Sequence, residues 1–455
     1  MQEVDIHKNK TTKQKLKVIL ALAIPAMVEN ILQTIVGFVD TLFVSKLGLN
    51  EVTSVGVANA VLAVYIAIFM ALGVGTSSLI ARSIGAGDIN KAKVIARQST
   101  YISAAFGLLF GLITLFFSEP LLRLMGAKSD VLADSITYFR IVATPSVFIS
   151  LMFIFGSILR AAGDTKTPMK VSWWINVIHI VLDYVLIFGI FGIEGLGVTG
   201  AAWATVAVRI IGTLALFYYI KRSKTISFNL FGTHSKDDTV SILRISAPAA
   251  IERLIMRLGQ VIYFGLIVKI GADTYAAHTI AGNIETFSYM PGYGLAIAAT
   301  TLVGQSIGAK KVREAYQYGM ITTIVAVVFM SFIGVVLFFL SPWFPTWFTT
   351  EPNAVDMVVT ALRIDSFAQP ALAVGLVLAG ALQGAGDTKS PMYSTVIGIW
   401  VIRVLGVYIL GIQLEMGIAG IWLSIAIDLY VRAIFLFYKF NSHSKAQKKV
   451  NTEVI

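Results

Sequence analysis

The sequence predicts an all-α membrane protein with twelve transmembrane helices in two six-helix lobes, related by a parallel internal repeat. Three observations carry this prediction. Of the 455 residues, 56% are hydrophobic and only 13% are charged, which is too little charge to cover the surface of a soluble protein of this size. Long apolar runs recur along the whole chain, and the second half of the chain repeats motifs of the first.

Each apolar run is long enough to cross a hydrocarbon core of about 30 Å, which takes roughly 20 helical residues. The first run carries Pro25 and acidic residues and is too long for a signal-peptide core, so we expect it to remain as the first helix. The predicted spans of the first half are 17–45, 53–80, 95–117, 134–158, 170–190 and 197–220. Those of the second half are 242–268, 275–303, 317–340, 356–381, 392–412 and 417–438. Together they leave no segment for a soluble catalytic domain.

Lysine and arginine gather in alternate loops and at both ends of the chain, for example Arg82, Lys91, Lys310, Lys311 and Lys439. The positive-inside rule places these loops in the cytoplasm. The sequence therefore predicts a multi-pass protein of the cell inner membrane with both termini cytoplasmic. This topology accounts for the net charge of +11 without a nucleic-acid partner, and the absence of cysteine excludes disulfides and thiolate metal sites.

One turn is written twice, as "LRAAGDTKTPM" at 159–169 and as "LQGAGDTKSPM" at 382–392, an offset of 223 residues. Gly163 suits the end of one helix, Asp164 and Thr165 can cap the next, and Pro168 fits a first turn. The same offset holds from the first to the fifth helix of each half, which indicates gene duplication. Because each copy has six spans, both enter the membrane in the same direction. We expect an N-lobe at 1–220, a cytoplasmic linker at 221–240, and a C-lobe with a short basic tail at 241–455.

Several motifs resemble the multidrug and toxic compound extrusion (MATE) family, and its DinF-like subgroup in particular. They are "PAMVENILQTIVGFVDTLFVSKLG" at 25–48, "SLIARSIGAGD" at 78–88, "TLVGQSIGAKK" at 301–311 and the paired hairpins. The resemblance covers residues 15–440. It implies a cation-coupled antiporter that expels bulky organic cations, with two lobes around a V-shaped cavity and no cofactor beyond the coupling ion.

Ionisable groups inside predicted spans are functional candidates because they are costly to bury in lipid. Asp40 lies roughly 9 Å below the outer end of the first span, and Asp183 roughly 13 Å below the outer end of the fifth, at about 1.5 Å per residue. Helical spacing puts Asp183 on one face with Asn176 and His179. The fourth and sixth spans add hydroxyls at similar depth. The predicted cation-coupling residues are Asp40, Tyr138, Asn176, His179, Asp183 and Thr205.

Two carboxylates at one depth cannot comfortably both ionise without a proton or a metal cation between them. Related MATE transporters place a cation on the first-helix aspartate and an "N-x-x-x-D" element, so the resemblance implies a possible sodium ion at Asp40 and Asp183. Here the element reads "HIVLD", and the titratable nitrogen of His179 favours a proton over sodium. No other metal site is expected.

The repeat provides an internal control on these residues. Asp40 corresponds to Tyr263 and Asp183 to Gly406, whereas Glu29 corresponds to Glu252. The aspartate pair is therefore confined to one lobe, as a single coupling site would be. The acids typical of the NorM-type C-lobe are also missing, since Met256 and Leu372 stand at their positions.

The candidate substrate-binding residues are Glu29, Gln33, Asp40, Met256 and Arg257, and most have a structural alternative. Glu29 can make a hydrogen bond at a helix entry, Met256 is ordinary filler of a membrane helix, and Arg257 can join a charge cluster with Glu252 and Arg253.

Other charged residues on the late spans have no predicted part in substrate binding. Asp428 and Arg432 are spaced for a salt bridge within one helix. Arg403 needs a partner that its spacing does not identify, and Arg363 and Asp365 remain unassigned.

Two other functions compete with the antiporter. A flippase for a lipid-linked sugar would use a basic, lipid-sized groove, for which Arg253, Arg257 and Arg403 are the candidates. An enzyme is disfavoured because the five histidines form no metal-spaced pair and no nucleophile or phosphate-loop motif occurs. We therefore expect a monomeric antiporter whose partners are small organic cations and the lipid bilayer.

Overall fold

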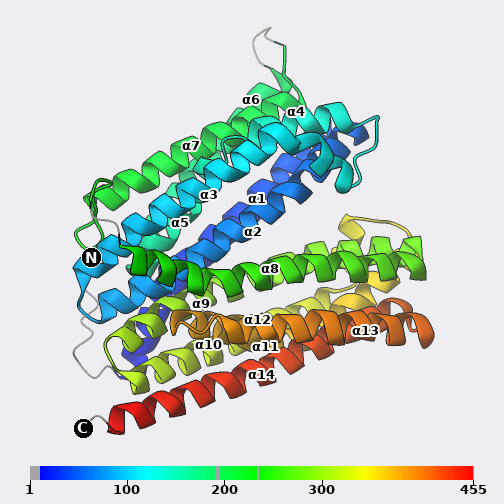
Figure 1. Ribbon diagram of the computed structural model, residues 1–455. Coiled ribbons are helices and arrows are strands. Elements are labelled where there is room, and N and C mark those ends of the chain that lie inside the picture. The colour runs from blue at the N-terminus through cyan, green and yellow to red at the C-terminus, as the bar shows by residue number, and fades with distance from the viewer. Residues whose placement is uncertain (1–10, 190–193, 233–234, 454–455) are drawn as a thin grey trace. The chain divides into compact units, whose positions relative to one another are not determined.

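The computed structural model describes residues 11–189, 194–232 and 235–453, with side chains up to 443, and every regular element in these ranges is helical (Figure 1). The first half contains α1 (Thr12–Ser45), α2 (Leu49–Gly85), α3 (Ile89–Leu124), α4 (Leu132–Ala143), α5 (Ser146–Ala161), α6 (Lys166–Phe188) and α7 (Val198–Arg222). The second half contains α8 (Lys236–Ile270), α9 (Ala272–Gly308), α10 (Val312–Leu340), η1 (Phe344–Trp347), α11 (Pro352–Gly384), α12 (Lys389–Val396), η2 (Ile397–Arg403), α13 (Val404–Gly406), η3 (Val407–Gln413) and α14 (Gly417–Glu453).

Each predicted apolar run coincides with one helix or with one interrupted helix, so the all-α fold class with twelve helical spans is confirmed. Most helices are longer than the run that predicted them, because they continue past the apolar part into polar residues. Within the described residues, nine helices are long and apolar enough to cross a membrane, and a tenth is formed if α4 and α5 make one span. α8 and α9 are not among these helices. α8 carries the basic residues Arg253, Arg257 and Lys269 along its apolar part.

Two of the spans are interrupted. α4 and α5 meet at an angle of 47°, and Pro145 stands between them, where its ring and missing N–H break the helical ladder. The span from Lys389 to Gln413 contains two π-helical stretches, η2 and η3. Such stretches are frequent at functional sites, and Arg403 is the last residue of η2.

The duplicated turn folds in the same way in both copies. Gly163 and Gly386 have φ values of 88° and 90°, a conformation that glycine adopts without strain. Asp164 accepts hydrogen bonds from the backbone N–H of Thr167 at 3.0 Å and from its hydroxyl at 2.6 Å. Asp387 does the same with Ser390, at 2.9 and 2.6 Å. The predicted capping by Asp164 is confirmed, whereas Thr165 makes no side-chain capping bond.

The chain divides into two compact units. The N-unit consists of Val28–Ile80 and Asp88–Ala250, and the C-unit of Met1–Met27, Ala81–Gly87 and Ile251–Ile455. α1, α2 and α8 thus contribute residues to both units. Around the segment predicted as a linker, α7 runs to Arg222 and α8 begins at Lys236, and residues 233–234 lie outside the described ranges. The lobe boundaries at 220 and 240 stay a prediction.

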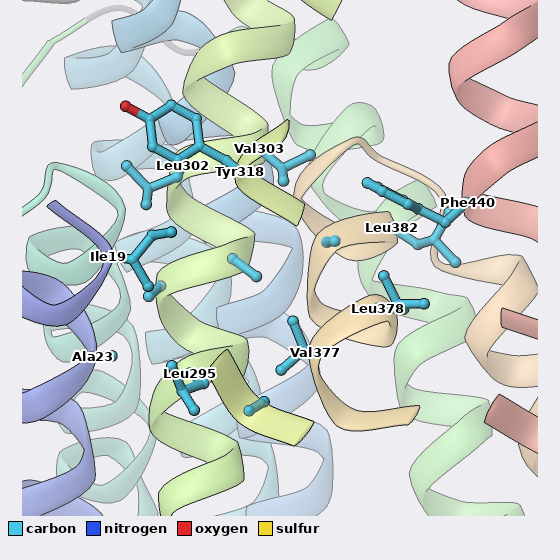
Figure 2. Packing of buried hydrophobic residues seen from close by; sticks show 14 of the residues in the cluster. Ile19, Ala23, Leu295, Leu302, Val303, Tyr318, Val377, Leu378, Leu382 and Phe440 are labelled. Atoms are coloured by element: carbon cyan, nitrogen blue, oxygen red, sulfur yellow. The ribbon is translucent and has the colours of Figure 1, made fainter. Parts of the chain in front are cut away.

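Each unit has its own apolar core. In the N-unit, buried residues of α2, α3, α4, α5 and α7 pack together, among them Phe69, Leu122, Phe139 and Ala201. Figure 2 shows part of the C-unit core, in which Ile19 of α1 faces α9 and residues of α11 face α9 from another side.

Glycines in α11 let it approach α9 closely in the C-unit. A Cβ atom on Gly380 would lie 2.6 Å from the carbonyl oxygen of Ala296, and one on Gly384 would lie 2.2 Å from that of Thr300. The Thr300 hydroxyl donates to the Gly380 carbonyl at 2.9 Å. Small residues of this kind fix helix pairs in membranes, so the C-terminal end of α11 is held closely against α9.

Candidate functional site

The stripe predicted on α6 is present in the N-unit. Asp183 is fully buried, with no side-chain surface exposed to solvent, and lies one turn after His179. The Nε2 atom of His179 is 3.4 Å from Oδ2 of Asp183. The helical period brings these two side chains together, because residues four apart share one face.

α4 and α7 bring hydroxyl groups to the same place. The Thr205 hydroxyl donates to the Ala201 carbonyl at 2.9 Å, and its Oγ1 is 3.4 Å from Nε2 of His179. Tyr138 is 3% exposed; its side chain contacts Thr205 and lies within electrostatic reach of Asp40 and Asp183. The structure therefore gathers α1, α4, α6 and α7 around one cluster, which we call the N-unit acid cluster: Asp40, Tyr138, His179, Asp183 and Thr205.

Several buried polar atoms of this region have no hydrogen-bond partner among the described residues. They are Oδ1 of Asp40, both carboxyl oxygens of Asp183, and Nδ2 of Asn176. A buried carboxylate without a donor is strongly unfavourable, and buried polar groups in folded proteins are nearly always satisfied. The two aspartates of the cluster therefore keep unused acceptor oxygens among the described residues.

Arg209 is a member of this region that the sequence analysis missed. It lies on α7 one turn after Thr205 and interacts electrostatically with Asp40 and Tyr138. Its guanidinium donates to the Val142 carbonyl at 3.4 Å. The sequence did carry a signal for it, because Arg209 follows the candidate ligand Thr205 by four residues inside a predicted span. If both aspartates are counted as ionised and His179 as neutral, the N-unit acid cluster together with Arg209 has a formal charge of −1.

The other two candidates on α1 have different surroundings. Glu29 is buried, and its Oε1 is 3.0 Å from Nη1 of Arg160 on α5. Its charge is therefore already compensated within the N-unit. Gln33 is exposed. The predicted role of these two residues in substrate binding remains untested.

The C-unit candidates lie on α8. Arg257 is exposed and donates to Gln260 of the same helix at 3.2 Å, while Met256 is partly buried. Glu252 accepts a hydrogen bond from Thr395 at 3.0 Å. It therefore does not reproduce the pairing of Glu29, because Gln383 stands at the position that corresponds to Arg160.

A buried ion-pair network holds the interrupted span to α14. Asp428 has no exposed surface; it accepts from Nε of Arg403 at 2.9 Å and from Nε of Arg432 at 2.6 Å. The predicted bridge between Asp428 and Arg432 is confirmed. The partner of Arg403, which its spacing did not identify, is the same aspartate.

Comparison with known proteins gives a consistent result. The family model described as MatE matches residues 25–185 and 248–409, and the second match begins 223 residues after the first, which is the offset of the repeat.

Among curated proteins, the chain is 30% identical over 96% of its length to a "Probable multidrug resistance protein NorM" of Thermotoga maritima, of which 94% is covered. It is 29% identical over 94% of its length to the "Uncharacterized transporter YisQ" of Bacillus subtilis, of which 95% is covered. A solved outward-facing structure of a multidrug resistance MATE family transporter of the MOP superfamily superposes with a TM-score of 0.90, at 28% identity. That match covers 97% of this chain and all of the other.

Proposed function

Because the chain belongs to the MatE family, we propose that it is a proton-coupled antiporter that exports bulky organic cations by alternating access. The protein is a multi-pass membrane transporter of the multidrug efflux kind, and not an enzyme. The coupling ion, the cationic nature of the substrate, a monomeric state and cytoplasmic termini are parts of the proposal. The alternate-loop distribution of lysine and arginine supports the orientation of the termini.

The observation that carries the proposal is the charge of the N-unit acid cluster. Asp183 is buried with both oxygens unpartnered, Asp40 has one such oxygen, and Arg209 compensates only one of the two carboxylates. One positive charge satisfies the cluster, and either a proton or an organic cation supplies it. Each of the two ligands weakens the binding of the other, so the coupling free energy between the two binding events is unfavourable. Such competition is the requirement for antiport.

The contact of His179 favours a proton over sodium as the coupling ion. Its ring nitrogen lies 3.4 Å from both the Asp183 carboxyl and the Thr205 hydroxyl. An imidazole can exchange a proton with a neighbouring carboxyl group, whereas a hard cation prefers oxygen ligands. The Asp183 carboxyl therefore has a proton-exchanging neighbour where the family element has an amide oxygen.

One of the three arginines considered for the flippase alternative, Arg403, argues against it. A basic groove for a lipid-linked sugar would need arginines whose charge is available to a phosphate. Arg403 is instead held by Asp428, with its Nη2 atom 2.7 Å from the carboxylate. The acid cluster, by contrast, has the sign that attracts a cation.

Alternating access requires α1 to change its packing as Asp40 gains and loses a proton. Pro25 lies inside α1 on the N-terminal side of Asp40, and proline removes a hydrogen bond from the helical ladder, which makes it a natural bending point. We propose that protonation of Asp40 alters how α1 packs on α6 and α7, and that α1 bends at Pro25 in response.

Purified protein in proteoliposomes tests the proposed coupling. An imposed pH gradient is expected to drive transport of a fluorescent lipophilic cation such as ethidium, and an imposed sodium gradient of the same size is expected to drive none. His179→Asn, which restores the usual family residue, is expected to lower the rate driven by the pH gradient and to admit sodium. Transport by the parent protein under the sodium gradient alone would overturn the assignment of the proton.

A further inference from the structure

The C-unit contains a second group of buried polar side chains, which the sequence analysis left unassigned. Asp365 on α11 is 1% exposed, and Gln369, one turn later, has no exposed surface. The Gln369 amide donates to Oδ2 of Asp365 at 2.7 Å and to the hydroxyl oxygen of Ser288 on α9 at 3.2 Å. Glu285 lies three residues before Ser288 on α9 and interacts electrostatically with Asp365. We call these four residues the C-unit oxygen cluster.

Two oxygen atoms of this cluster have no hydrogen-bond donor. Oδ1 of Asp365 and Oε1 of Gln369 are buried and unpartnered among the described residues. The cluster therefore combines an amide oxygen, a hydroxyl oxygen and two carboxyl groups. Two of these oxygen atoms receive no hydrogen bond from the described residues. The unused atoms are therefore all acceptors, which suits a cation and not an anion.

Each of the two acids lies thirteen residues after the start of its helix, Glu285 in α9 and Asp365 in α11. At about 1.5 Å per residue this places both roughly 20 Å along their helices. The hydrogen bond from Gln369 of α11 to Ser288 of α9 joins the two helices at that level. The cluster therefore bridges the helix pair.

The charges around the cluster leave Asp365 uncompensated. The titratable and charged groups of the helices around it are His278, Glu285, Tyr289 and Tyr293 of α9, Glu252, Arg253, Arg257 and Tyr263 of α8, Arg403 of η2, and Asp428 and Arg432 of α14. Arg363 of α11 has its guanidinium over the ring of Phe338 of α10, 5.4 Å from the ring centre.

Arg403 interacts with Asp428 and Glu285, and Arg432 with Asp428 and Glu252. Asp365 itself interacts with Glu285, whose charge has the same sign, and accepts a hydrogen bond from the uncharged Gln369 amide, so it has no positively charged partner among these contacts.

We propose that the C-unit oxygen cluster is a second monovalent-cation site, which holds a proton or a sodium ion between Asp365 and Glu285. The site is not the repeat image of the N-unit acid cluster, because Leu62 and Val142 stand at the positions equivalent to Glu285 and Asp365. It goes beyond the proposed function, since it concerns binding at equilibrium and does not require Asp40.

Infrared spectroscopy of the full-length protein in lipid nanodiscs tests the proposal and separates the two cations. If the site holds a proton, the parent shows a carboxylic acid C=O band at neutral pH in choline chloride and in sodium chloride alike. If it holds sodium, the band is present in choline chloride and is lost when sodium replaces choline. In both cases the band appears in the difference between the parent and Asp365→Asn, in which any protonated acid of the N-unit acid cluster cancels.

Three further variants keep the test conclusive. Glu285→Gln is expected to lose the band as well, because Arg403 then remains to compensate Asp365, and this variant carries the test if Asp365→Asn does not fold. Asp356→Asn, the same chemical change at an exposed position of α11, is expected to keep it, and so is Asp40→Asn. Parent spectra that match those of Asp365→Asn and Glu285→Gln in both salts would overturn the proposal. The transport measurements are separate, so failure of proton coupling leaves this result unaffected.

Discussion

Asp40→Asn is expected to reduce uphill transport of an organic cation to the background of empty liposomes. An asparagine has the shape of the aspartate but cannot carry the negative charge that attracts either the proton or the substrate. With Arg209 still present, the charge of the N-unit acid cluster changes from −1 to neutral. Proteoliposomes with an imposed pH gradient and a fluorescent cation give the rate directly.

The control for this change comes from the repeat. Tyr263→Phe alters the equivalent position of the C-unit and keeps the aromatic ring, over which the Arg403 guanidinium lies at 5.5 Å. It is expected to retain most of the transport. Because Asp40→Asn also removes a charge that interacts with Arg209, the thermal unfolding of both variants is measured beside their transport. Comparable losses of transport in the two variants would mean that coupling is not confined to the N-unit.

Asp428→Asn is expected to lower the stability of the protein by about 3–5 kcal/mol, the cost of removing one partner of a buried ion pair. Asp428 has no exposed surface and holds the guanidinium groups of both Arg403 and Arg432. Without the carboxylate, two positive charges remain close together inside the C-unit. Thermal unfolding in detergent, followed by the monodisperse fraction after heating, measures the effect.

Two variants separate this effect from a general sensitivity of the protein to substitution. Asp356→Asn at an exposed site is expected to change stability by no more than about 0.5 kcal/mol. The double variant Asp428→Asn with Arg432→Gln is expected to lose less stability than the two single variants lose together, because one of the two unpaired positive charges is then removed. Equal unfolding temperatures for Asp428→Asn and Asp356→Asn would contradict the assigned role of the network.

The sequence predicted features that depend on spacing along one helix. Asp183 and His179 are four residues apart on α6, and Asp428 and Arg432 are four apart on α14, and each pair is in contact. The repeated turn was predicted in the same way, because Asp164 caps a helix that begins within three residues of it. In each case the periodic backbone fixes the geometry before any tertiary contact is made.

Contacts between helices were beyond this reasoning. Arg403 and Asp428 are 25 residues apart on different helices. The residue pattern within one helix does not say how that helix is rotated about its axis relative to another. Glu285 was missed, and Asp365 stayed without a role, for a related reason. The repeat was followed outward from the N-lobe acids, and no acid stands at the N-lobe positions equivalent to these two, which are Leu62 and Val142. Arg209 was missed although its span was predicted, because its partners lie on α1 and α4.

The affinity for an organic cation as a function of pH tests the central claim most directly, namely that a proton and the substrate compete for one negative charge at Asp40. Equilibrium binding to the parent protein and to Asp40→Asn is measured in sodium-free buffer from mildly acid to mildly alkaline pH. The parent is expected to bind more weakly as pH falls, since protonation removes the charge, and Asp40→Asn is expected to bind weakly at every pH. A flat curve for the parent, with displacement of the substrate by sodium alone, would contradict the account.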